Sequence, residues 1–279
     1  MDLFSELNNL MAHYSFKPSK KFSQNFLINK VVLDKMVALA ELKSSDVVLE
    51  IGSGTGFLTK ELLKHCKVIG IELDEKLIEI LKKEILNSNE LSERKNFELI
   101  EGDFLKVELP EFNKIVSCPP YQISSGIMYK LFSLDFDFAV FLLQREFVEK
   151  LLAEENFMEY TAITVLINYF FEPVFEFKVA NSSFFPAPKT ESAVIKLISR
   201  KRFGKVEDEQ LFIKFVKNIF RFKNKNFSNA LKQSFDELSK TKELNKEKVF
   251  EKANAMKHST EKVQSLSVKA LVKIFNELF

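Results

Sequence analysis

The chain has 279 residues, 46% of them hydrophobic, and a formal net charge of +2 at pH 7. This length predicts one large domain with a smaller one, and the overall charge neither favours nor excludes a nucleic-acid partner. No apolar run reaches the length of a membrane span, and the first residues lack the pattern of a signal peptide. The two cysteines, Cys66 and Cys118, and the three scattered histidines form no metal-type spacing, so we expect a reduced, cytoplasmic compartment and no metal.

Strand patterns alternate with helix patterns along the first half of the chain. Compact apolar runs typical of buried parallel strands occur at residues 46–52, 67–74, 97–103, 113–118 and 138–144. Apolar residues at helical spacing occur at residues 57–66, 75–85 and 145–155. This alternation predicts a doubly wound α/β sheet. Residues 171–180 and 192–199 also read as strands, and they would close the sheet as a hairpin around the loop NSSFFPAPKTE.

The composition shifts at the charged stretch RKRFGK, residues 200–205, after which amphipathic helical patterns follow with no strand-like run. We therefore predict two domains, residues 1–200 and residues 201–279, the second one all helical. Ten Lys and Arg residues against three Asp and Glu residues lie between positions 200 and 232, a local balance of +7. The near-neutral total conceals this basic block.

Glycines and acids gather at the predicted ends of three successive strands. The stretch EIGSGTGF follows the first strand, and Gly52, Gly54 and Gly56 allow positive φ and the close approach of a ligand. The G-x-G-x-G spacing is one residue tighter than the dinucleotide fingerprint, which favours a ligand without a pyrophosphate. Glu72 can accept hydrogen bonds from ribose hydroxyls, and Asp103 can accept one from an adenine amino group. A simpler interpretation is a tight turn with solvated carboxylates, but the combination favours S-adenosylmethionine.

The segment IVSCPPYQISSG, residues 115–126, ends the fourth strand with a rigid corner. Its two prolines fix two φ angles and push the preceding residues toward extended conformations. Amino-group methyltransferases place a similar corner here. Its aromatic ring stacks on the base, and acceptors turn the poorly nucleophilic exocyclic amine toward the methyl donor. The target base must be extruded or unpaired to reach such a site.

These motifs, taken together, resemble one known family. The chain is similar to the ribosomal RNA adenine N6,N6-dimethyltransferases, which modify small-subunit rRNA, in SKKFSQNFLINK, EIGSGTG, IELD, EGD, PPYQISSG, SSFFPAPKTESAVIKL and FRFKNKNFSNAL. The resemblance runs from about Lys17 to beyond Lys232, and PPYQISSG looks like the archaeal and eukaryotic form of its motif. It implies a Rossmann-like class I S-adenosylmethionine-dependent methyltransferase fold with a small C-terminal all-α domain.

The resemblance also implies roles for individual residues. Those that would flank or hold the cofactor are Gln24, Asn25, Leu27, Gly52, Gly54, Gly56, Glu72, Asp103 and Cys118. Tyr121 and Phe184 would sandwich the extruded adenine. The catalytic corner would be completed by Cys118, Pro119 and Pro120.

Two positions depart from the family pattern. Ser23 stands where the family usually has glycine before QNFL, and Cys118 stands where it normally has Asn. A thiol is a weaker acceptor than a carboxamide oxygen, so we expect slow transfer or transfer limited to one methyl per base. Two alternatives stay open for Cys118: a nucleophile, as in cytosine C5 methylation, and a simple packing role.

Lysine and arginine alternate with phenylalanine in two segments, which suggests RNA contact. At helical spacing Lys217, Arg221 and Lys225 share one face, and Phe residues lie on another. We predict phosphate contacts for Lys20, Lys21, Lys217, Arg221, Lys223 and Lys225. The alternative is an amphipathic helix whose Phe residues form a core and whose Lys residues are solvated.

The sequence thus predicts a monomeric enzyme that uses S-adenosylmethionine to dimethylate N6 of two adjacent adenosines near the 3′ end of small-subunit rRNA. Its partner would be the immature small ribosomal subunit, with no membrane and no metal. One alternative is a large-subunit rRNA adenine N6-methyltransferase of the erythromycin-resistance type. Another is a ribosome-assembly or RNA-binding factor with impaired catalysis. Cys118 supports the last alternative, whereas the glycine turn, Glu72 and Asp103 argue against it.

Overall fold

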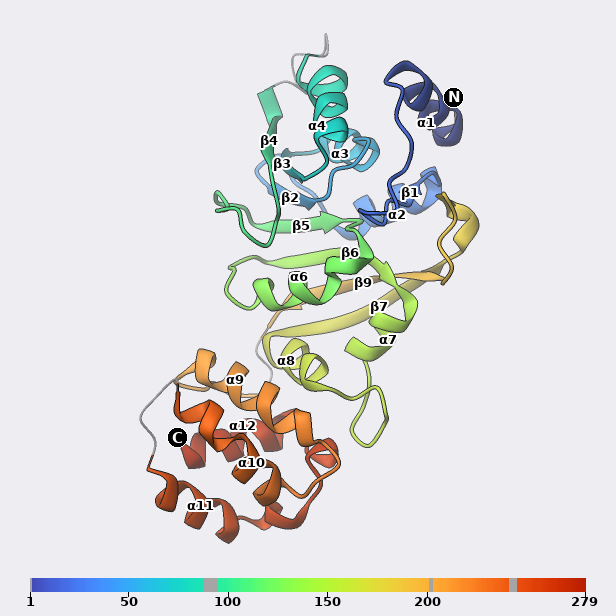
Figure 1. Ribbon diagram of the computed structural model, residues 1–279. Coiled ribbons are helices and arrows are strands. Elements are labelled where there is room, and N and C mark those ends of the chain that lie inside the picture. Colours follow the sequence, from blue (N-terminus) through green and yellow to red (C-terminus); the bar gives the residue numbers. More distant parts are fainter. Residues whose placement is uncertain (1, 88–94, 201–202, 241–244) are drawn as a thin grey trace. The chain divides into compact units, whose positions relative to one another are not determined.

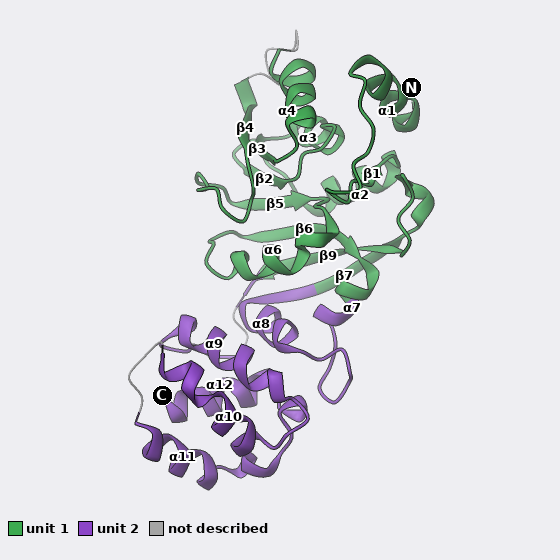
Figure 2. Ribbon diagram, in the orientation of Figure 1, with its two compact units in different colours: residues 1–148, 174–198 green, residues 149–173, 199–279 purple. Residues whose placement is uncertain are grey.

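The computed structural model describes residues 2–87, 95–200, 203–240 and 245–279 (Figure 1). The chain divides into two compact units, which Figure 2 colours separately. Unit 1 comprises Met1–Val148 and Val174–Ile198, and unit 2 comprises Glu149–Pro173 and Ser199–Phe279. The predicted domain boundary between residues 200 and 201 falls at residues 201–202, which lie outside the described residues, and it stays a prediction.

A mixed sheet of seven strands in the order β4-β3-β2-β5-β6-β9-β7 forms the centre of the fold. The strands are β2 (Val47–Ile51), β3 (Lys67–Glu72), β4 (Phe97–Glu101), β5 (Lys114–Ser117), β6 (Phe138–Gln144), β7 (Phe171–Val179) and β9 (Ser192–Ser199). Strands β2 to β6 pair in parallel, and β9 pairs antiparallel with β6. The predicted α/β sheet is therefore confirmed, including its two late strands.

The central strands β2, β3, β5 and β6 are almost entirely buried, as expected of parallel strands that are covered on both faces. Val48, Val68 and Val116 belong to one core cluster with side chains of α1 (Leu3–His13), α2 (Lys30–Leu39), α3 (Phe57–Leu63) and α4 (Glu75–Leu81). The alternating residues Leu49 and Ile69, which point to the opposite face, are also buried. Further helical segments that the structure describes in this half of the chain are the π-helical turn η1 (Lys82–Leu86), the 3₁₀ turn η2 (Tyr121–Ile123), α6 (Ser124–Leu131) and α7 (Arg145–Leu151).

The register of the parallel strands brings their carboxyl ends to one edge. Ile51 pairs with Ile71, and Glu72 pairs with Glu101. The segments that follow β2, β3, β4 and β5 therefore begin at the same edge of the sheet, where open α/β folds bind their ligands. The glycine turn follows β2, Glu72 is the last residue of β3, Asp103 follows β4, and the Cys-Pro-Pro-Tyr corner follows β5.

A second, two-stranded sheet joins two segments that lie far apart in the sequence. β1 (Phe26–Leu27) pairs antiparallel with β8 (Phe184–Phe185), with Leu27 opposite Phe184. The connection between β7 and β9 also contains the 3₁₀ turn η3 (Asn181–Ser183). This small sheet places the N-terminal QNFL segment beside the loop that carries Phe184, so both reach the edge of the large sheet.

Unit 2 packs its helices around phenylalanine side chains. Its helices are α8 (Ala162–Phe170), α9 (Glu209–Ile219), α10 (Phe227–Ser239), α11 (Lys246–Ala255) and α12 (Val268–Leu278), with 3₁₀ turns η4 (Phe220–Phe222), η5 (Lys257–Thr260) and η6 (Val263–Ser265). The Phe212 and Phe275 rings lie 5.2 Å apart, and the Phe215 ring lies 5.6 Å from that of Phe275. The predicted helical C-terminal part is thus confirmed. None of the described helices is long and apolar enough to cross a membrane.

Candidate functional site

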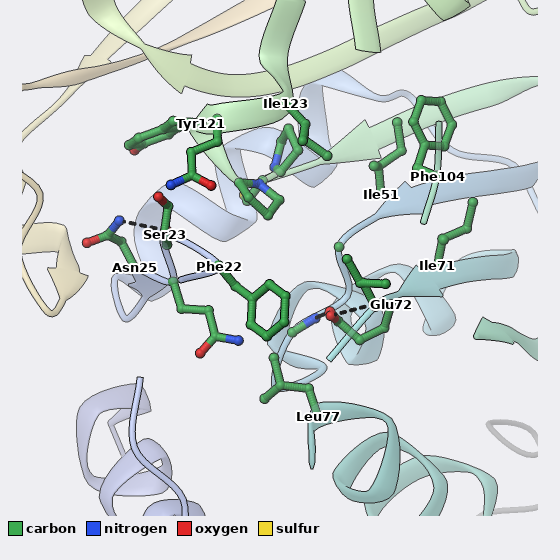
Figure 3. Close-up of a pocket in the computed structure, with 18 of the residues that line it drawn as sticks. Phe22, Ser23, Asn25, Ile51, Ile71, Glu72, Leu77, Phe104, Tyr121 and Ile123 are labelled. Carbon is green, nitrogen blue, oxygen red and sulfur yellow. Dashed lines mark hydrogen bonds between the residues drawn. The ribbon is translucent and has the colours of Figure 1, made fainter. Parts of the chain in front are cut away.

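A cavity of about 230 Å³ opens at the carboxyl edge of the parallel strands (Figure 3). Side chains from the N-terminal segment, the glycine turn, the ends of β3 and β4 and the corner after β5 line it. Its lining includes Gln24, Asn25, Gly52, Gly54, Glu72, Asp103, Cys118, Pro119, Pro120, Tyr121 and Phe184. The predicted cofactor and base residues therefore meet in one place, except Leu27 and Gly56, which do not line the cavity.

The glycine turn after β2 takes a conformation that other residues rarely adopt. Gly52 has φ 76° and Gly56 has φ 80°. A Cβ added to Gly52 would lie 3.1 Å from Cδ of Pro120, so the turn packs tightly against the corner after β5. Gly56 is the N-cap of α3, and its added Cβ would lie 2.8 Å from Cδ1 of Ile85. The turn thus lines the cavity with Gly52 and Gly54, and it allows the start of helix α3 to pack closely at Gly56.

Glu72 is buried, and backbone N–H groups hold its carboxylate in place. Its Oε2 accepts from the N–H of Gly54 at 2.8 Å, as drawn in Figure 3. Its Oε1 accepts from the N–H groups of Leu73 at 2.8 Å and Asp74 at 2.9 Å. Burial raises the pKa of Glu72 above its ordinary value. The carboxylate is therefore fixed in direction and retains lone pairs for a ligand.

Asp103 lies one residue beyond Gly102, which follows β4, and its side chain is 28% exposed. Its Oδ1 accepts from the N–H of Leu105 at 3.0 Å, and its Oδ2 lies 3.6 Å from Nζ of Lys106. These contacts leave the carboxylate accessible from the cavity, which Gly102 and Phe104 also line. The two predicted acids are thus present at neighbouring strand ends, one buried and one partly exposed.

Gln24 ties the N-terminal segment to the turn after β3. Its Nε2 donates to Oδ2 of Asp74 at 2.7 Å, and its Oε1 accepts from the N–H of Ser19 at 2.7 Å. Asn25 donates from Nδ2 to the carbonyl of Ser23 at 3.0 Å. The Gln24 carboxamide therefore closes one side of the cavity, a structural role that its sequence position does not reveal.

Two further residues of this segment explain parts of the sequence pattern. Ser23 has φ 48°, in the left-handed region, which costs a non-glycine residue about 1 kcal/mol. A glycine would adopt this conformation without that cost. Leu27 is buried within β1 and contributes to the core.

Cys118 is the first residue of the corner, and it is half-buried against the hydrophobic core. Its Sγ lies 3.7 Å from Sδ of Met36, and burial raises the pKa of its thiol. The thiol is therefore protonated at neutral pH, and a protonated thiol is a poor nucleophile. This environment argues against the interpretation of Cys118 as the nucleophile of a C5 methylation.

Tyr121 and Phe184 supply two aromatic rings to the cavity. The Tyr121 hydroxyl lies 2.6 Å from Oγ of Ser192, and burial raises the pKa of Tyr121 to about 12. Phe184 is only 4% exposed and belongs to β8. Sequence reasoning had missed Ser192, because no local pattern relates the first residue of β9 to a corner about seventy positions earlier.

A buried acid, Glu50, lies in β2 beside the glycine turn. Its Oε2 accepts from Oγ1 of Thr59 at 2.6 Å, and burial raises its pKa to about 8. The folded protein therefore keeps a proton on Glu50 at pH values where the unfolded chain has lost it.

We expect the contribution of Glu50 to the free energy of unfolding to fall by about 3 kcal/mol as pH rises from 5 to 8. Glu50→Gln should reduce the total fall by about the same amount and leave the contribution of Glu72, whose pKa burial also raises. Denaturant unfolding at pH 5 and 8 measures the change, and an equal fall in both proteins would contradict the assignment.

The predicted RNA-contact residues differ in their surroundings. Lys20 and Lys21 of unit 1 are exposed, as are Lys217, Arg221 and Lys225 of unit 2. Lys223 is half-buried, and its ammonium donates to the carbonyls of Met158 at 2.6 Å and Tyr160 at 3.3 Å. The Lys223 side chain therefore holds the loop after α7, whereas the neighbouring basic residues are exposed.

The fold and the cavity are those of a Rossmann-like class I methyltransferase, a class whose members use S-adenosylmethionine. The chain belongs to a particular family within that class, because the family model described as ribosomal RNA adenine dimethylase matches residues 15–271.

Relatives and solved structures agree with this family. The chain is 38% identical to the probable ribosomal RNA small subunit methyltransferase A of Thermococcus sibiricus, over 98% of this chain and 96% of that protein. It is 42% identical to the protein of the same name from Methanosarcina barkeri, over 82% of this chain and 77% of that one. The dimethyladenosine transferase of Plasmodium falciparum superposes with a TM-score of 0.74 at 29% identity, covering 88% of this chain and 94% of that one. The 23S rRNA methyltransferase ErmE gives a TM-score of 0.63 at 25% identity, covering 91% and 99%.

Proposed function

We propose that this protein transfers methyl groups from S-adenosylmethionine to N6 of two adjacent adenosines near the 3′ end of small-subunit rRNA, during ribosome biogenesis. One observation carries the proposal. The glycine turn, Glu72, Asp103, Tyr121 and Phe184 line a single cavity. A site for a methyl donor and a site for a flat base are therefore contiguous. We also propose that the enzyme acts as a monomer in the cytoplasm, on the immature subunit.

The charge of the cavity supports a cationic nucleoside as its ligand. Its lining contains two carboxylates and no Lys, Arg or His among the described residues. A dinucleotide would bring a pyrophosphate, for which this lining offers no cation. S-adenosylmethionine carries a positive sulfur and no phosphate, so the residues present fit it.

The two acids divide the recognition of the nucleoside between them. Glu72 presents oxygens whose direction is fixed by three backbone N–H groups, and it accepts from the ribose hydroxyls. Asp103 accepts from the adenine amino group, beside Phe104. The backbone at Gly52 and Gly54 lines the cavity and can be approached closely by the amino-acid end of the ligand. When bound, S-adenosylmethionine would supply a methyl group on a sulfonium, from which a neutral thioether departs as a good leaving group.

The corner and Phe184 hold the target base. Tyr121 stacks on one face of the extruded adenine and Phe184 on the other, which fixes the ring plane and places N6 in line with the methyl group. Acceptors in the corner take the N6 hydrogens, so that the nitrogen lone pair turns toward the methyl group. The methylated nitrogen then loses a proton readily, so no strong general base is needed. Glu72 and Asp103 remain free for the cofactor.

Cys118 weakens this acceptor set, because its thiol takes the place of a carboxamide. We expect Cys118→Asn to accelerate the second methyl transfer about tenfold, the value of one good hydrogen bond. Single-turnover kinetics with separation of mono- and dimethyladenosine measure this rate. Cys118→Ser, which is nearly isosteric and a better acceptor than the thiol, should give an intermediate rate, and Cys118→Ala a slower one. Equal rates in all four proteins would show that residue 118 does not contribute an acceptor.

The exposed cations of α9 and the turn η4 are proposed to contact rRNA phosphates. We expect Lys217→Glu combined with Arg221→Glu to weaken binding to small subunits about tenfold at moderate salt, with an unchanged cofactor Kd. The salt dependence of the subunit Kd should also become shallower. Lys248→Glu with Lys269→Glu, a matched charge reversal at exposed positions outside this block, is the control. A parallel loss of cofactor affinity would contradict a role confined to RNA.

The target subunit decides between the main proposal and its rivals. We expect the purified protein to transfer labelled methyl from S-adenosylmethionine to small subunits that lack the modification, and to yield N6,N6-dimethyladenosine on nucleoside analysis. Preferential labelling of large-subunit rRNA would favour the erythromycin-resistance type of activity, to which ErmE is the structural parallel. Cofactor and subunit binding without any transfer would favour an assembly factor.

A further inference from the structure

We propose that Ser192 is a positioning residue, which fixes the Tyr121 ring in the orientation that stacks on the target adenine. The inference rests on the proposed function and adds to it a residue outside the cavity lining. The Tyr121 hydroxyl and Oγ of Ser192 lie 2.6 Å apart. Ser192 is fully buried and is the first residue of β9. A short hydrogen bond to a buried partner holds the far end of the ring.

The Ser192 side of this bond is rigid. Ser192 pairs with Gln144, the last residue of β6. The residues before it are tied to the same place, because the Arg145 N–H donates to the Glu191 carbonyl at 2.9 Å and Gln144 Nε2 donates to Oγ1 of Thr190 at 3.3 Å. The hydroxyl of Ser192 therefore occupies a position set by the sheet itself.

The Tyr121 side is held at its other end by the backbone. Two prolines precede Tyr121, and it begins the 3₁₀ turn η2. The Cβ end is therefore fixed by the stiff corner and the hydroxyl end by Ser192. Burial raises the pKa of Tyr121 to about 12, so the phenol keeps its proton at neutral pH. To swing the ring out of the cavity, the protein would have to break this hydrogen bond and leave the buried Ser192 hydroxyl without it.

Ser192 also links the two aromatic rings of the site. The connection between β7 and β9 carries Phe184, and Ser192 is the residue at which this connection enters β9. A base between the two rings thus contacts Phe184, which the β7–β9 connection carries, and Tyr121, which hydrogen-bonds to Ser192 at the end of that connection. This arrangement fixes the spacing between the two rings before the base binds. Less conformational entropy of these side chains is therefore lost on binding, which favours affinity for the base.

Kinetics test the proposal through non-additivity. Ser192→Ala and Tyr121→Phe each remove the hydrogen bond and keep the ring, so each should lower kcat about tenfold with an unchanged cofactor Kd. The double variant should be no slower than either single variant. Ser199→Ala, at the exposed last residue of β9, is the control and should match the wild type. Effects that multiply in the double variant would mean that Ser192 acts only through local stability, and would overturn the proposal.

A measurement without turnover separates this proposal from the proposed function. The chain has five tyrosines, so ring signals of ¹³C-labelled tyrosine are resolvable by NMR, and the Tyr121→Phe spectrum assigns those of Tyr121. We expect Ser192→Ala to speed the flipping of the Tyr121 ring and shift its signals, with the other four unchanged. Unchanged Tyr121 signals would overturn the proposal that Ser192 positions Tyr121. If the wild type transferred no methyl group but the Tyr121 signals still changed in Ser192→Ala, only the proposed methyltransferase function would be overturned.

Discussion

Replacing Tyr121 by alanine is expected to lower kcat for adenine methylation by about 100- to 1000-fold. The substitution removes the stacking surface, worth roughly 1–3 kcal/mol per base, and the in-line placement of N6. The Tyr121 ring lines the cavity, as does Phe184. Single-turnover transfer to unmodified small subunits measures the effect, and calorimetry of S-adenosylmethionine shows whether the donor site survives.

The matched variant for this prediction is Tyr121→Phe, which keeps the ring and loses only the bond to Ser192. It should retain most of the stacking and lose about one tenfold factor. If alanine and phenylalanine reduced kcat equally, the hydroxyl and not the ring would be the contributing group. The stacking assignment would then be wrong.

Glu72→Gln is expected to weaken S-adenosylmethionine binding by about 100-fold or more. The carboxylate accepts three backbone N–H groups with its two oxygens. A carboxamide must turn its NH₂ toward one of these donors, and it loses the charge-assisted bonds to the ribose, worth roughly 1.5–3 kcal/mol each. Isothermal calorimetry measures the change in Kd.

Glu101→Gln is the control for this variant, because Glu101 pairs with Glu72 in the register of β3 and β4 but is exposed and does not line the cavity. Its cofactor Kd should stay within about twofold of the wild type, since removing an exposed charge has little effect. An equal loss in both variants would assign the effect to the general negative charge of this edge and not to Glu72.

The central strands and the glycine turn could be predicted because their signals are local. An apolar run that ends in glycine or an acid predicts both a buried strand and the polar groups at its end. The bounds of β6 are those that the apolar run predicts. Parallel pairing then brings the four strand ends to one edge without further information. Helix ends were less accurate. α3 ends at Leu63 and α7 ends at Leu151. Each helix ends three or four residues before the end of its helical pattern of apolar residues, because the chain turns toward the next segment before that pattern ends.

The features that sequence reasoning had missed depend on contacts between distant segments. The β1–β8 sheet has strands of two residues each, too short for any periodicity. The Gln24–Asp74 bond likewise joins positions that no local pattern relates. Lys223 looks like its basic neighbours in sequence, yet its ammonium is held by two carbonyls of a loop more than sixty residues earlier. Such contacts are decided by the fold and not by the pattern of either segment.

The most direct test of the account is a crystal structure of the protein with S-adenosylhomocysteine and adenosine. We expect the nucleoside of the cofactor product to bond to Glu72 and Asp103. The adenosine base should lie between the rings of Tyr121 and Phe184, with N6 facing the sulfur. A base bound elsewhere, or a cofactor product outside this cavity, would contradict the assignment of the site.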